Sequence, residues 1–272
     1  MKTFEELGVS EEIRRAIEEL GFENPMPVQE EVIPYLLGNK NDVIALAQTG
    51  TGKTASYGIP VIQKTDASSK QTQAVILSPT RELCLQIADD LNSFAKYIDG
   101  LHIAAVYGGT DIGSQIRTLK HGVQIIVATP GRLLDLINRG VAQLENVNNV
   151  VLDEADEMLN MGFYKDVRHI IELMKARKHL SMFSATISRE VMDIGWLYQH
   201  NAEEITVQPR EESQPKITQY MLETSGRNKL SDLAQIIIGE GYKRVMVFCD
   251  TKFNTATLAN QLARLGFSVD CL

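Results

Sequence analysis

The sequence is poor in cysteine. Its three cysteines, Cys84, Cys249 and Cys271, are far apart and show no Cys-x-x-Cys spacing. This pattern indicates neither a zinc site nor a disulfide framework, and it predicts reduced thiols. The five histidines are scattered as well, without a His-Glu-x-x-His pattern. Zinc-dependent and disulfide-stabilised classes of protein are therefore not indicated.

Long apolar runs are missing too. No apolar run reaches the roughly 18 residues that a membrane helix needs, and the N-terminal segment MKTFEELGVSEEIRR is acidic and has no apolar targeting region. We therefore expect a soluble, cytoplasmic protein that does not interact with a membrane.

Positive charge is in deficit. The chain has 27 lysines and arginines against 35 aspartates and glutamates, which gives a formal net charge of −8. A polyphosphate partner would on average be repelled by this charge. Any contact with nucleic acid is therefore expected to be local.

Short β-branched apolar segments alternate with amphipathic segments along most of the chain. This alternation is typical of βαβ units, so we predict an α/β fold with a parallel sheet and helices on both faces. In the helical segment 191–198, we expect Trp196 to pack between helix and sheet. The predicted strands are 42–47, 74–78, 102–106, 124–128, 149–152, 180–183 and 204–207.

A polar segment with two prolines, residues 208–216, has the composition of a linker between a domain 1–207 and a second unit 217–272. In the second unit we predict strands 217–222 and 244–249 and a last strand from residue 267, with helices 229–239 and 254–265. Three strands make a marginal independent core. We therefore expect a second α/β domain that is cut short, whose unpaired strand edge favours self-association or a swapped dimer.

The segment A-Q-T-G-T-G-K-T follows the first predicted strand and opens a helix, which is the setting of a phosphate-binding loop. Gly50 and Gly52 allow the backbone to approach phosphate oxygens closely. Lys53 would lie between the β- and γ-phosphates, and the Thr54 hydroxyl could bind Mg²⁺. We predict a site for a nucleoside triphosphate formed by Ala47, Gln48, Thr49, Gly50, Thr51, Gly52, Lys53 and Thr54.

An acidic segment, D-E-A-D, follows the apolar strand 149–152. Alone, it could be a solvated helix start whose acids compensate the helix dipole. Together with the phosphate loop, it predicts that Asp153 holds Mg²⁺ and that Glu154 orients or deprotonates the attacking water.

With these two motifs the chain resembles the DEAD-box RNA helicases, and the match runs in order through almost the whole sequence. The family's Q motif is present as G-F-E-N-P-M-P-V-Q at residues 21–29. The resemblance implies that Gln29 recognises the edge of adenine and that Phe22, with Phe4 upstream, packs on the base, so ATP is the expected nucleotide. Both phenylalanines could instead belong to the core. The usual threonine of the motif is Met26 here.

Further motifs of the same family follow. Ser184 and Thr186 in S-A-T resemble the motif that links the nucleotide site to domain closure, with a hydrogen bond to Asp156. Three other segments each follow a predicted strand, where ligands gather on open α/β sheets. The resemblance implies sequence-independent contacts to the RNA backbone from Pro79, Thr80, Arg81, Gly108, Gly109, Thr129, Pro130, Gly131 and Arg132.

The resemblance therefore implies an ATP-dependent RNA helicase of the P-loop NTPase, RecA-like fold, an RNA-stimulated ATPase that clamps and locally unwinds short duplexes. The family's later arginines are absent from this sequence. Since a transition-state arginine contributes a factor of about 10³ to 10⁵ in rate, we expect nucleotide binding but little helicase activity. A non-catalytic, nucleotide-switched RNA-binding module is the alternative, and a kinase or transporter ATPase would lack the Q motif.

Overall fold

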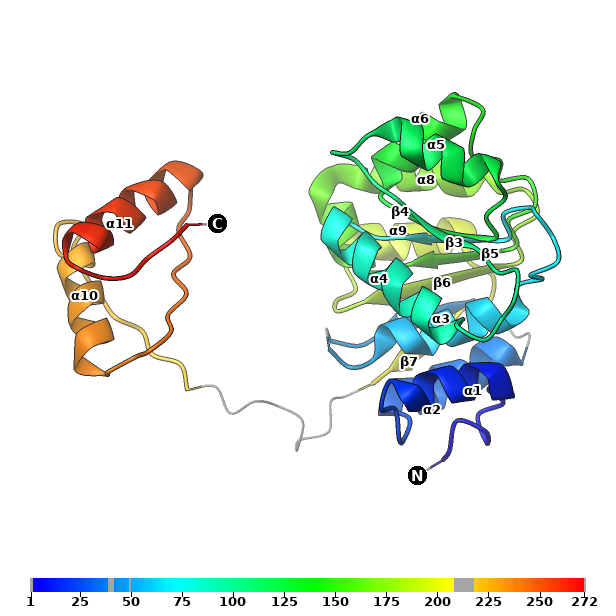
Figure 1. The fold of residues 1–272 in the computed structure, drawn as a ribbon, viewed down its shortest axis with the longest axis horizontal. Helices are drawn as coiled ribbons and strands as arrows, with labels where there is room; N and C mark the ends of the chain where they lie inside the picture. Colours follow the sequence, from blue (N-terminus) through cyan, green and yellow to red (C-terminus); the bar gives the residue numbers. More distant parts are fainter. Residues whose placement is uncertain (1, 39–41, 49, 208–217, 272) are drawn as a thin grey trace. The chain divides into compact units, whose positions relative to one another are not determined.

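The structure is a computed structural model that describes residues 2–38, 42–48, 50–207 and 218–271. The chain divides into two compact units, residues 1–214 and 215–272, and the larger unit contains the sheet (Figure 1). Within the described ranges, no helix has the length and apolar character needed to cross a membrane.

The larger unit is built on one sheet of seven parallel strands in the order β3-β4-β2-β5-β6-β1-β7. The predicted parallel α/β fold is therefore confirmed, and every strand predicted for this unit is present. The strands are β1 (Val43–Leu46), β2 (Ala74–Leu77), β3 (Ile103–Val106), β4 (Ile125–Ala128), β5 (Asn149–Leu152), β6 (His179–Ser184) and β7 (Glu203–Thr206).

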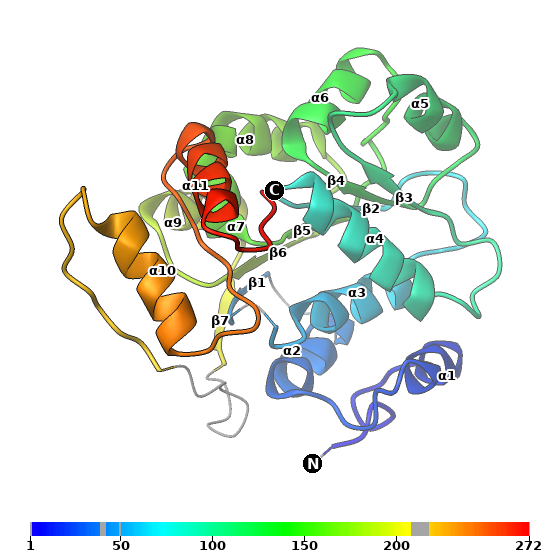
Figure 2. The same ribbon diagram turned by 60° about the vertical axis from the view of Figure 1, so that its left-hand side comes forward.

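Helices cover both faces of this sheet (Figures 1 and 2). One face packs against α1 (Glu11–Glu19), α2 (Pro27–Leu37), α3 (Lys53–Lys64) and α4 (Arg81–Phe94). The other packs against α5 (Ile112–Lys120), α6 (Pro130–Asn138), α7 (Ala155–Met158), the π-helical turn η1 (Leu159–Phe163), α8 (Tyr164–Leu173) and α9 (Arg189–Tyr198).

The central strands are apolar without interruption because both of their faces are buried. On β2, Val75 and Ile76 are each fully buried, yet they belong to the two different hydrophobic clusters on opposite faces. Burying such a side chain stabilises the fold by about 1.5 to 3 kcal/mol. Because the strands are parallel, all of their carboxyl ends lie at one edge of the sheet, where the loops to α3, α4, α6 and α7 begin.

The opposite edge of the sheet is fixed by the buried carboxylate of Asp42, which precedes β1 and is 2% exposed. Its Oδ1 accepts a hydrogen bond from the amide of Leu180 at 2.8 Å, and its Oδ2 accepts one from the amide of His200 at 2.8 Å. Gln199 adds hydrogen bonds to the carbonyls of Val43 and Leu180. One side chain therefore ties the start of β1 to β6 and to the segment that enters β7.

The smaller unit differs from the prediction. Its helices α10 (Lys229–Gly239) and α11 (Lys252–Arg264) lie close to the predicted positions. The predicted strands are wrong, because no residue between 218 and 271 belongs to a strand; residue 217 lies outside the described residues. Extended segments need a hydrogen-bonded neighbour to form a sheet. Without one, Met246 and Phe248 are 73% and 87% exposed.

Trp196 also departs from the prediction. It was expected to pack between helix and sheet, but it is 76% exposed. The buried face of α9 is formed by Val191, Ile194 and Gly195, which leaves the neighbouring indole on the solvent side of the helix.

Replacing Asp42 with alanine should lower the free energy of unfolding of the larger unit by about 2 to 4 kcal/mol, because the buried amide of Leu180 and the partly buried amide of His200 lose a charged acceptor. Urea denaturation followed by circular dichroism measures this change. The control is Asp89→Ala, at an exposed position on α4, which should change the same free energy by less than about 0.5 kcal/mol. Equal effects of the two substitutions would contradict the role assigned to Asp42.

Candidate functional site

The loop after β1 places several backbone amides at the start of α3. The Ala47 amide donates to the carbonyl of Ser184 at 3.1 Å, which continues the pairing of β1 with β6. The chain then turns through Gly50 and Gly52, whose φ angles of 82° and 86° lie in the left-handed region. The Thr51 hydroxyl closes the turn on the carbonyl of Gln48 at 2.7 Å. Thr49, also predicted for this site, lies outside the described residues.

Helix α3 begins directly after this turn, with Gly52 as its N-cap. Because glycine has no side chain, it cannot cap the first amides of the helix. These amides and the positive end of the helix dipole together form an anion-binding position. The geometry is therefore suitable for a phosphate group.

Lys53, the first residue of α3, reaches the acidic segment that follows β5. The lysine is 6% exposed, and its Nζ lies 3.5 Å from Oε1 of Glu154. Glu154 has a left-handed backbone with φ 48° and ψ 50°, a conformation that costs a non-glycine residue about 1 kcal/mol or more. Two sequence-distant predicted residues thus meet at the carboxyl edge of the sheet, across the end of β6.

Asp153 is the most deeply buried acid of this site, at 3% exposure. Its Oδ2 accepts a hydrogen bond from the Tyr57 hydroxyl at 2.9 Å, and its Oδ1 accepts one from the Glu154 amide at 3.0 Å. Burial raises the pKa of Asp153 to about 6, although the Lys53 charge and the Tyr57 hydrogen bond act to lower it. The site therefore holds a carboxylate whose charge is only partly compensated by the protein.

The chemistry of these donors fits a magnesium ion. The Asp153 carboxylate and the Thr54 hydroxyl offer hard oxygen atoms, and a buried carboxylate with a raised pKa is stabilised by a nearby cation. No cluster of three or more His, Cys, Asp or Glu side chains suited to a metal occurs in the part of the chain that the structure describes. Mg²⁺ held by one or two protein oxygens and completed by substrate phosphates is consistent with this arrangement.

The S-A-T segment at the end of β6 is joined to Asp156 by several hydrogen bonds. The amide and the hydroxyl of Thr186 both donate to Asp156 Oδ2, at 2.9 and 2.7 Å. The Asp156 amide donates to the Ser184 hydroxyl oxygen at 3.2 Å. The hydrogen bonding predicted between this segment and Asp156 is confirmed.

Gln29 connects the segment 21–29 with the phosphate loop. Its Oε1 accepts a hydrogen bond from the Met26 amide at 2.9 Å, and its Nε2 donates to the carbonyl of Gly52 at 3.2 Å. A side chain at position 52 would displace the Gln29 amide, since a Cβ atom there would lie 2.6 Å from its Nε2. Position 52 therefore favours glycine chiefly through its left-handed backbone angle.

The two predicted aromatic residues of this region stack on one another. The ring centroids of Phe4 and Phe22 are 6.4 Å apart, and Phe22 also contacts Phe94 with its centroid 5.9 Å away. Phe4 is 7% exposed and belongs to the hydrophobic core, as the packing alternative predicts. Phe22 is only partly buried, so it is the aromatic residue of this pair that a base could reach.

The loops after β2, β3 and β4 lie side by side, because these strands are neighbours in the order β3-β4-β2. After β2, Pro79 is buried and the Thr80 hydroxyl caps α4 by accepting from the Leu83 amide at 3.2 Å. Arg81 is exposed, and its guanidinium lies 5.1 Å from the ring centroid of Tyr107. A positively charged side chain therefore faces the loop that follows β3.

Gly108 and Gly109 form the exposed part of that loop, and Gly109 has a φ angle of 81°. After β4, the Thr129 amide donates to the Val106 carbonyl at 2.9 Å, and Pro130 begins α6. Gly131 is exposed at the same helix start. The loops after β3 and β4 therefore present small residues and a helix N-terminus on one side of the sheet edge.

Arg132 joins these two loops. Its guanidinium donates to Gln115 Oε1 and to the Thr110 carbonyl, both at 3.2 Å. Gln115, at 8% exposure, in turn donates to the Tyr107 carbonyl at 3.0 Å. One buried amide thus orders both the glycine loop and the arginine.

Gln115 and Tyr57 were not singled out from the sequence. Tyr57 lies four residues after Lys53, so it projects from the same face of α3 one turn later. Gln115 is a polar residue at a position that the helical pattern of α5 directs inward. Both signals are visible in the sequence, but neither identifies the partner atom.

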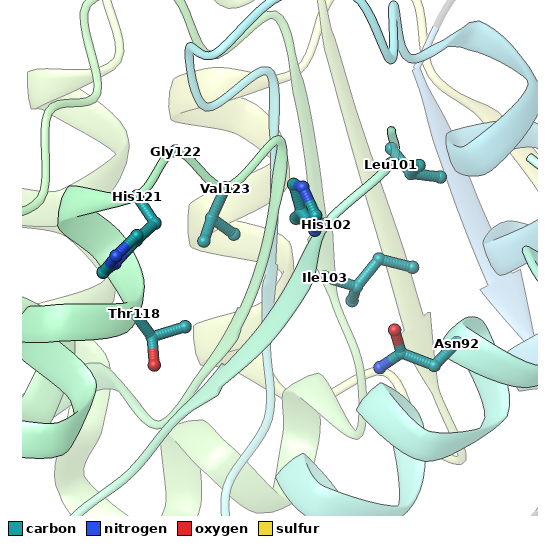
Figure 3. A pocket seen from close by; sticks show the side chains of 8 residues that line it. All are labelled: Asn92, Leu101, His102, Ile103, Thr118, His121, Gly122 and Val123. Carbon is teal, nitrogen blue, oxygen red and sulfur yellow. The ribbon is translucent and has the colours of Figure 1, made fainter. Parts of the chain in front are cut away.

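A pocket of about 350 Å³ is lined by a different set of residues (Figure 3). It is formed at the amino ends of β3 and β4, where His102 and Val123 precede the strands, with Asn92 and Thr118 from α4 and α5 and His121 directly after α5. None of the predicted functional residues lines it. The carboxyl edge of the sheet remains the candidate site.

Comparison with known proteins gives consistent matches. Residues 26–194 match the family model described as DEAD/DEAH box helicase. The chain is 41% identical over 270 residues to the DEAD-box ATP-dependent RNA helicase CshA of Geobacillus kaustophilus, covering 99% of this chain and 57% of that protein. It is 39% identical over 265 residues to the ATP-dependent RNA helicase DeaD of Haemophilus influenzae, covering 97% of this chain and 43% of that protein. The chain thus spans about half the length of these relatives.

Solved structures agree with the sequence matches. The structure of a DEAD box protein from Methanococcus jannaschii superposes with a TM-score of 0.73 at 39% identity, covering 99% of this chain and 72% of the other. A hypothetical ATP-dependent RNA helicase from Sulfolobus tokodaii gives a TM-score of 0.68 at 39% identity, covering 73% of this chain and 57% of the other. The fold is therefore that of the RecA-like domains of such proteins.

Replacing Asp153 with asparagine should stabilise the unliganded protein near neutral pH. The folded-state pKa of about 6 lies above the ordinary 3.8, so the folded state binds the proton more tightly, and the stability of the wild type falls as pH rises between these values. The neutral amide removes this penalty.

Thermal unfolding across this pH range tests the expectation. The melting temperature of Asp153→Asn should exceed that of the wild type near neutral pH, and the difference should shrink below the ordinary pKa of 3.8. Asp135→Asn, which removes the charge of an exposed partner of Arg139, should show no such difference. A lower melting temperature for Asp153→Asn near neutral pH would contradict the assigned burial penalty.

Proposed function

Because this chain belongs to the DEAD/DEAH box helicase family, we propose that it binds ATP with Mg²⁺ at the carboxyl ends of β1, β5 and β6 and RNA along the loops after β2, β3 and β4. The observation that carries the proposal is the approach of Lys53 to Glu154, 3.5 Å apart beside the buried Asp153. Lys53 is positively charged and Glu154 is negatively charged, and a phosphate can bind beside this pair.

The adenine base would bind at the Q motif. The Gln29 amide uses one acceptor position for the Met26 amide and one donor for the Gly52 carbonyl, and it retains a second acceptor and a second donor. This combination complements the donor and acceptor of the adenine edge. The partly buried ring of Phe22 offers a face on which the base can stack. Gln29 contacts Gly52 through its Nε2, so the base and the phosphates would bind to connected segments.

The phosphates would bind to the amides around Gly50 and Gly52 and to the Lys53 ammonium group. Lys53 interacts with Glu154, so the phosphates would compete with this carboxylate for the lysine. Thr54 and Asp153 would hold Mg²⁺, which supplies charge neutralisation to the phosphate oxygens.

Glu154 would orient the attacking water and accept its proton, while the oxygen of that water bonds to the γ-phosphorus and the bond to the ADP oxygen breaks. Asp156 would couple changes at the nucleotide site to the S-A-T segment, because it is hydrogen-bonded to Ser184 and Thr186. In the longer proteins of the family, this connection would couple hydrolysis to domain closure. The whole protein would clamp RNA and locally unwind short duplexes.

RNA would contact the loops that carry Arg81 and Arg132, together with the exposed glycines between them. Such a surface offers backbone amides and guanidinium groups to phosphates and 2′-hydroxyls. It does not require base-specific contacts. Local positive charge at this edge reconciles RNA binding with the net charge of −8.

Replacing Lys53 with alanine should weaken ATP binding by about 30-fold or more. The reason is that the ammonium group would pair with the phosphates, and truncating one member of such a charge pair costs about 2 to 5 kcal/mol of binding free energy. Fluorescence titration with a labelled adenine nucleotide measures the affinity. Lys120→Ala, an exposed lysine at the end of α5, is the control and should leave the affinity unchanged. Retained affinity in Lys53→Ala would refute the proposed ATP site.

Replacing Arg132 with alanine should weaken single-stranded RNA binding in the presence of nucleotide and reduce its salt dependence. The logarithmic salt slope should fall by about 0.7, the value for one lost phosphate contact. Arg139→Ala is the matched control, because this exposed arginine is the C-cap of α6 and pairs with Asp135 of the same helix at 2.7 Å. An RNA affinity and salt slope equal to those of the wild type in Arg132→Ala would contradict the proposed RNA surface.

A further inference from the structure

We propose that Tyr57 is a positioning residue of the nucleotide site and that its phenol fixes the Asp153 carboxylate in the orientation needed to hold Mg²⁺. The inference rests on the proposed ATP site and assigns to it a residue outside the phosphate loop and the D-E-A-D segment. Tyr57 lies on α3, one helical turn after Lys53, and Asp153 follows β5. Helix α3, which begins at the phosphate loop, therefore also binds the Asp153 side chain that follows β5.

The contact is direct and fully buried. The Tyr57 hydroxyl donates to Asp153 Oδ2 at 2.9 Å, and the two side chains are 0% and 3% exposed. The tyrosine ring is itself fixed, since its centroid lies 4.9 Å from that of Phe183 on β6. Because the packed ring holds the Tyr57 hydroxyl in place, this hydroxyl fixes the position of Asp153 Oδ2.

Two hydrogen bonds together determine the plane of the carboxylate. The Glu154 amide binds Oδ1 at 3.0 Å, and the Tyr57 phenol binds Oδ2 at 2.9 Å. The terminal torsion of an aspartate is otherwise broad. An ionised carboxylate has about four acceptor positions, so two positions remain available after these bonds. Their directions are set by the two donors.

Tyr57 also shares helix α3 with Thr54, the second proposed oxygen donor. Thr54 and Tyr57 are three residues apart on the same helix, which places them on one face. The same helix face thus carries Thr54 and the phenol that binds Asp153. A hydrogen-bonding partner behind a metal ligand typically changes metal affinity by about 10- to 100-fold when it is removed.

A purely structural role is the competing explanation. In that case the aromatic ring fills the core beside Phe183, and the hydroxyl merely finds a partner in Asp153. The substitution Tyr57→Phe separates the two roles, because it keeps the ring and removes only the hydroxyl. A structural role predicts a change in stability but no selective change in Mg²⁺ dependence.

The test is a titration of a fluorescent ADP analogue with and without Mg²⁺, performed on the full chain. In Tyr57→Phe the apparent Mg²⁺ affinity in the presence of ADP should fall by about 10-fold or more, while the metal-free ADP affinity should change by less than about twofold. Tyr35→Phe is the matched control. Its hydroxyl contacts the Asp42 carbonyl, away from this site, and its Mg²⁺ dependence should equal that of the wild type.

A double substitution makes the test specific and does not depend on the stability of one variant. If Tyr57 acts through Asp153, adding Tyr57→Phe to Asp153→Asn should cause no further loss of Mg²⁺ dependence. An unchanged Mg²⁺ dependence in Tyr57→Phe alone, or an equal further loss in the double variant, would overturn the inference. Failure of the wild type to bind the analogue at all would instead remove the proposed ATP site itself.

Discussion

The parallel direction of the strands is the constraint on which the rest of the structure depends. Because all seven strands point the same way, their carboxyl ends form one edge, and residues distant in sequence are brought together there. The strand order divides this edge into two regions. The ends of β5, β6 and β1 carry Asp153, Ser184 and the phosphate loop, and the neighbouring ends of β3, β4 and β2 carry the exposed glycines and the two arginines. Nucleotide and RNA would therefore bind to one rigid element, side by side.

The nucleotide half of this edge contains features that oppose folding. Asp153 is a buried acid with a raised pKa, and Glu154 has a left-handed backbone. Both are unfavourable by themselves, and both lie where a cation and phosphates would bind. Such local costs are common at functional sites. The buried apolar strands supply the stabilisation that allows them to persist.

Sequence reasoning identified the sheet because its signal is strong: buried parallel strands are continuous β-branched runs, and each is followed by an amphipathic helix. It also placed Lys53, Asp153 and Ser184 together, since each follows a strand.

It could not identify Tyr57 or Gln115, whose importance lies in one buried atom and its partner. Sequence reasoning placed Trp196 between helix and sheet because an indole is usually buried. Which residues of α9 are buried depends instead on the face that the helix turns to the sheet, and Trp196 is not on that face. The strand predictions for the smaller unit were wrong for a related reason, because an apolar extended segment becomes a strand only beside a hydrogen-bonded neighbour.

Ser184 has a position with a consequence for how the two halves of the nucleotide site move. Its carbonyl accepts from the Ala47 amide at the base of the phosphate loop, and its hydroxyl accepts from the Asp156 amide. One residue at the tip of β6 is therefore bonded to both flanking segments through different atoms. A displacement of either segment would therefore strain a hydrogen bond to the same residue, which links the phosphate loop mechanically to the acidic turn.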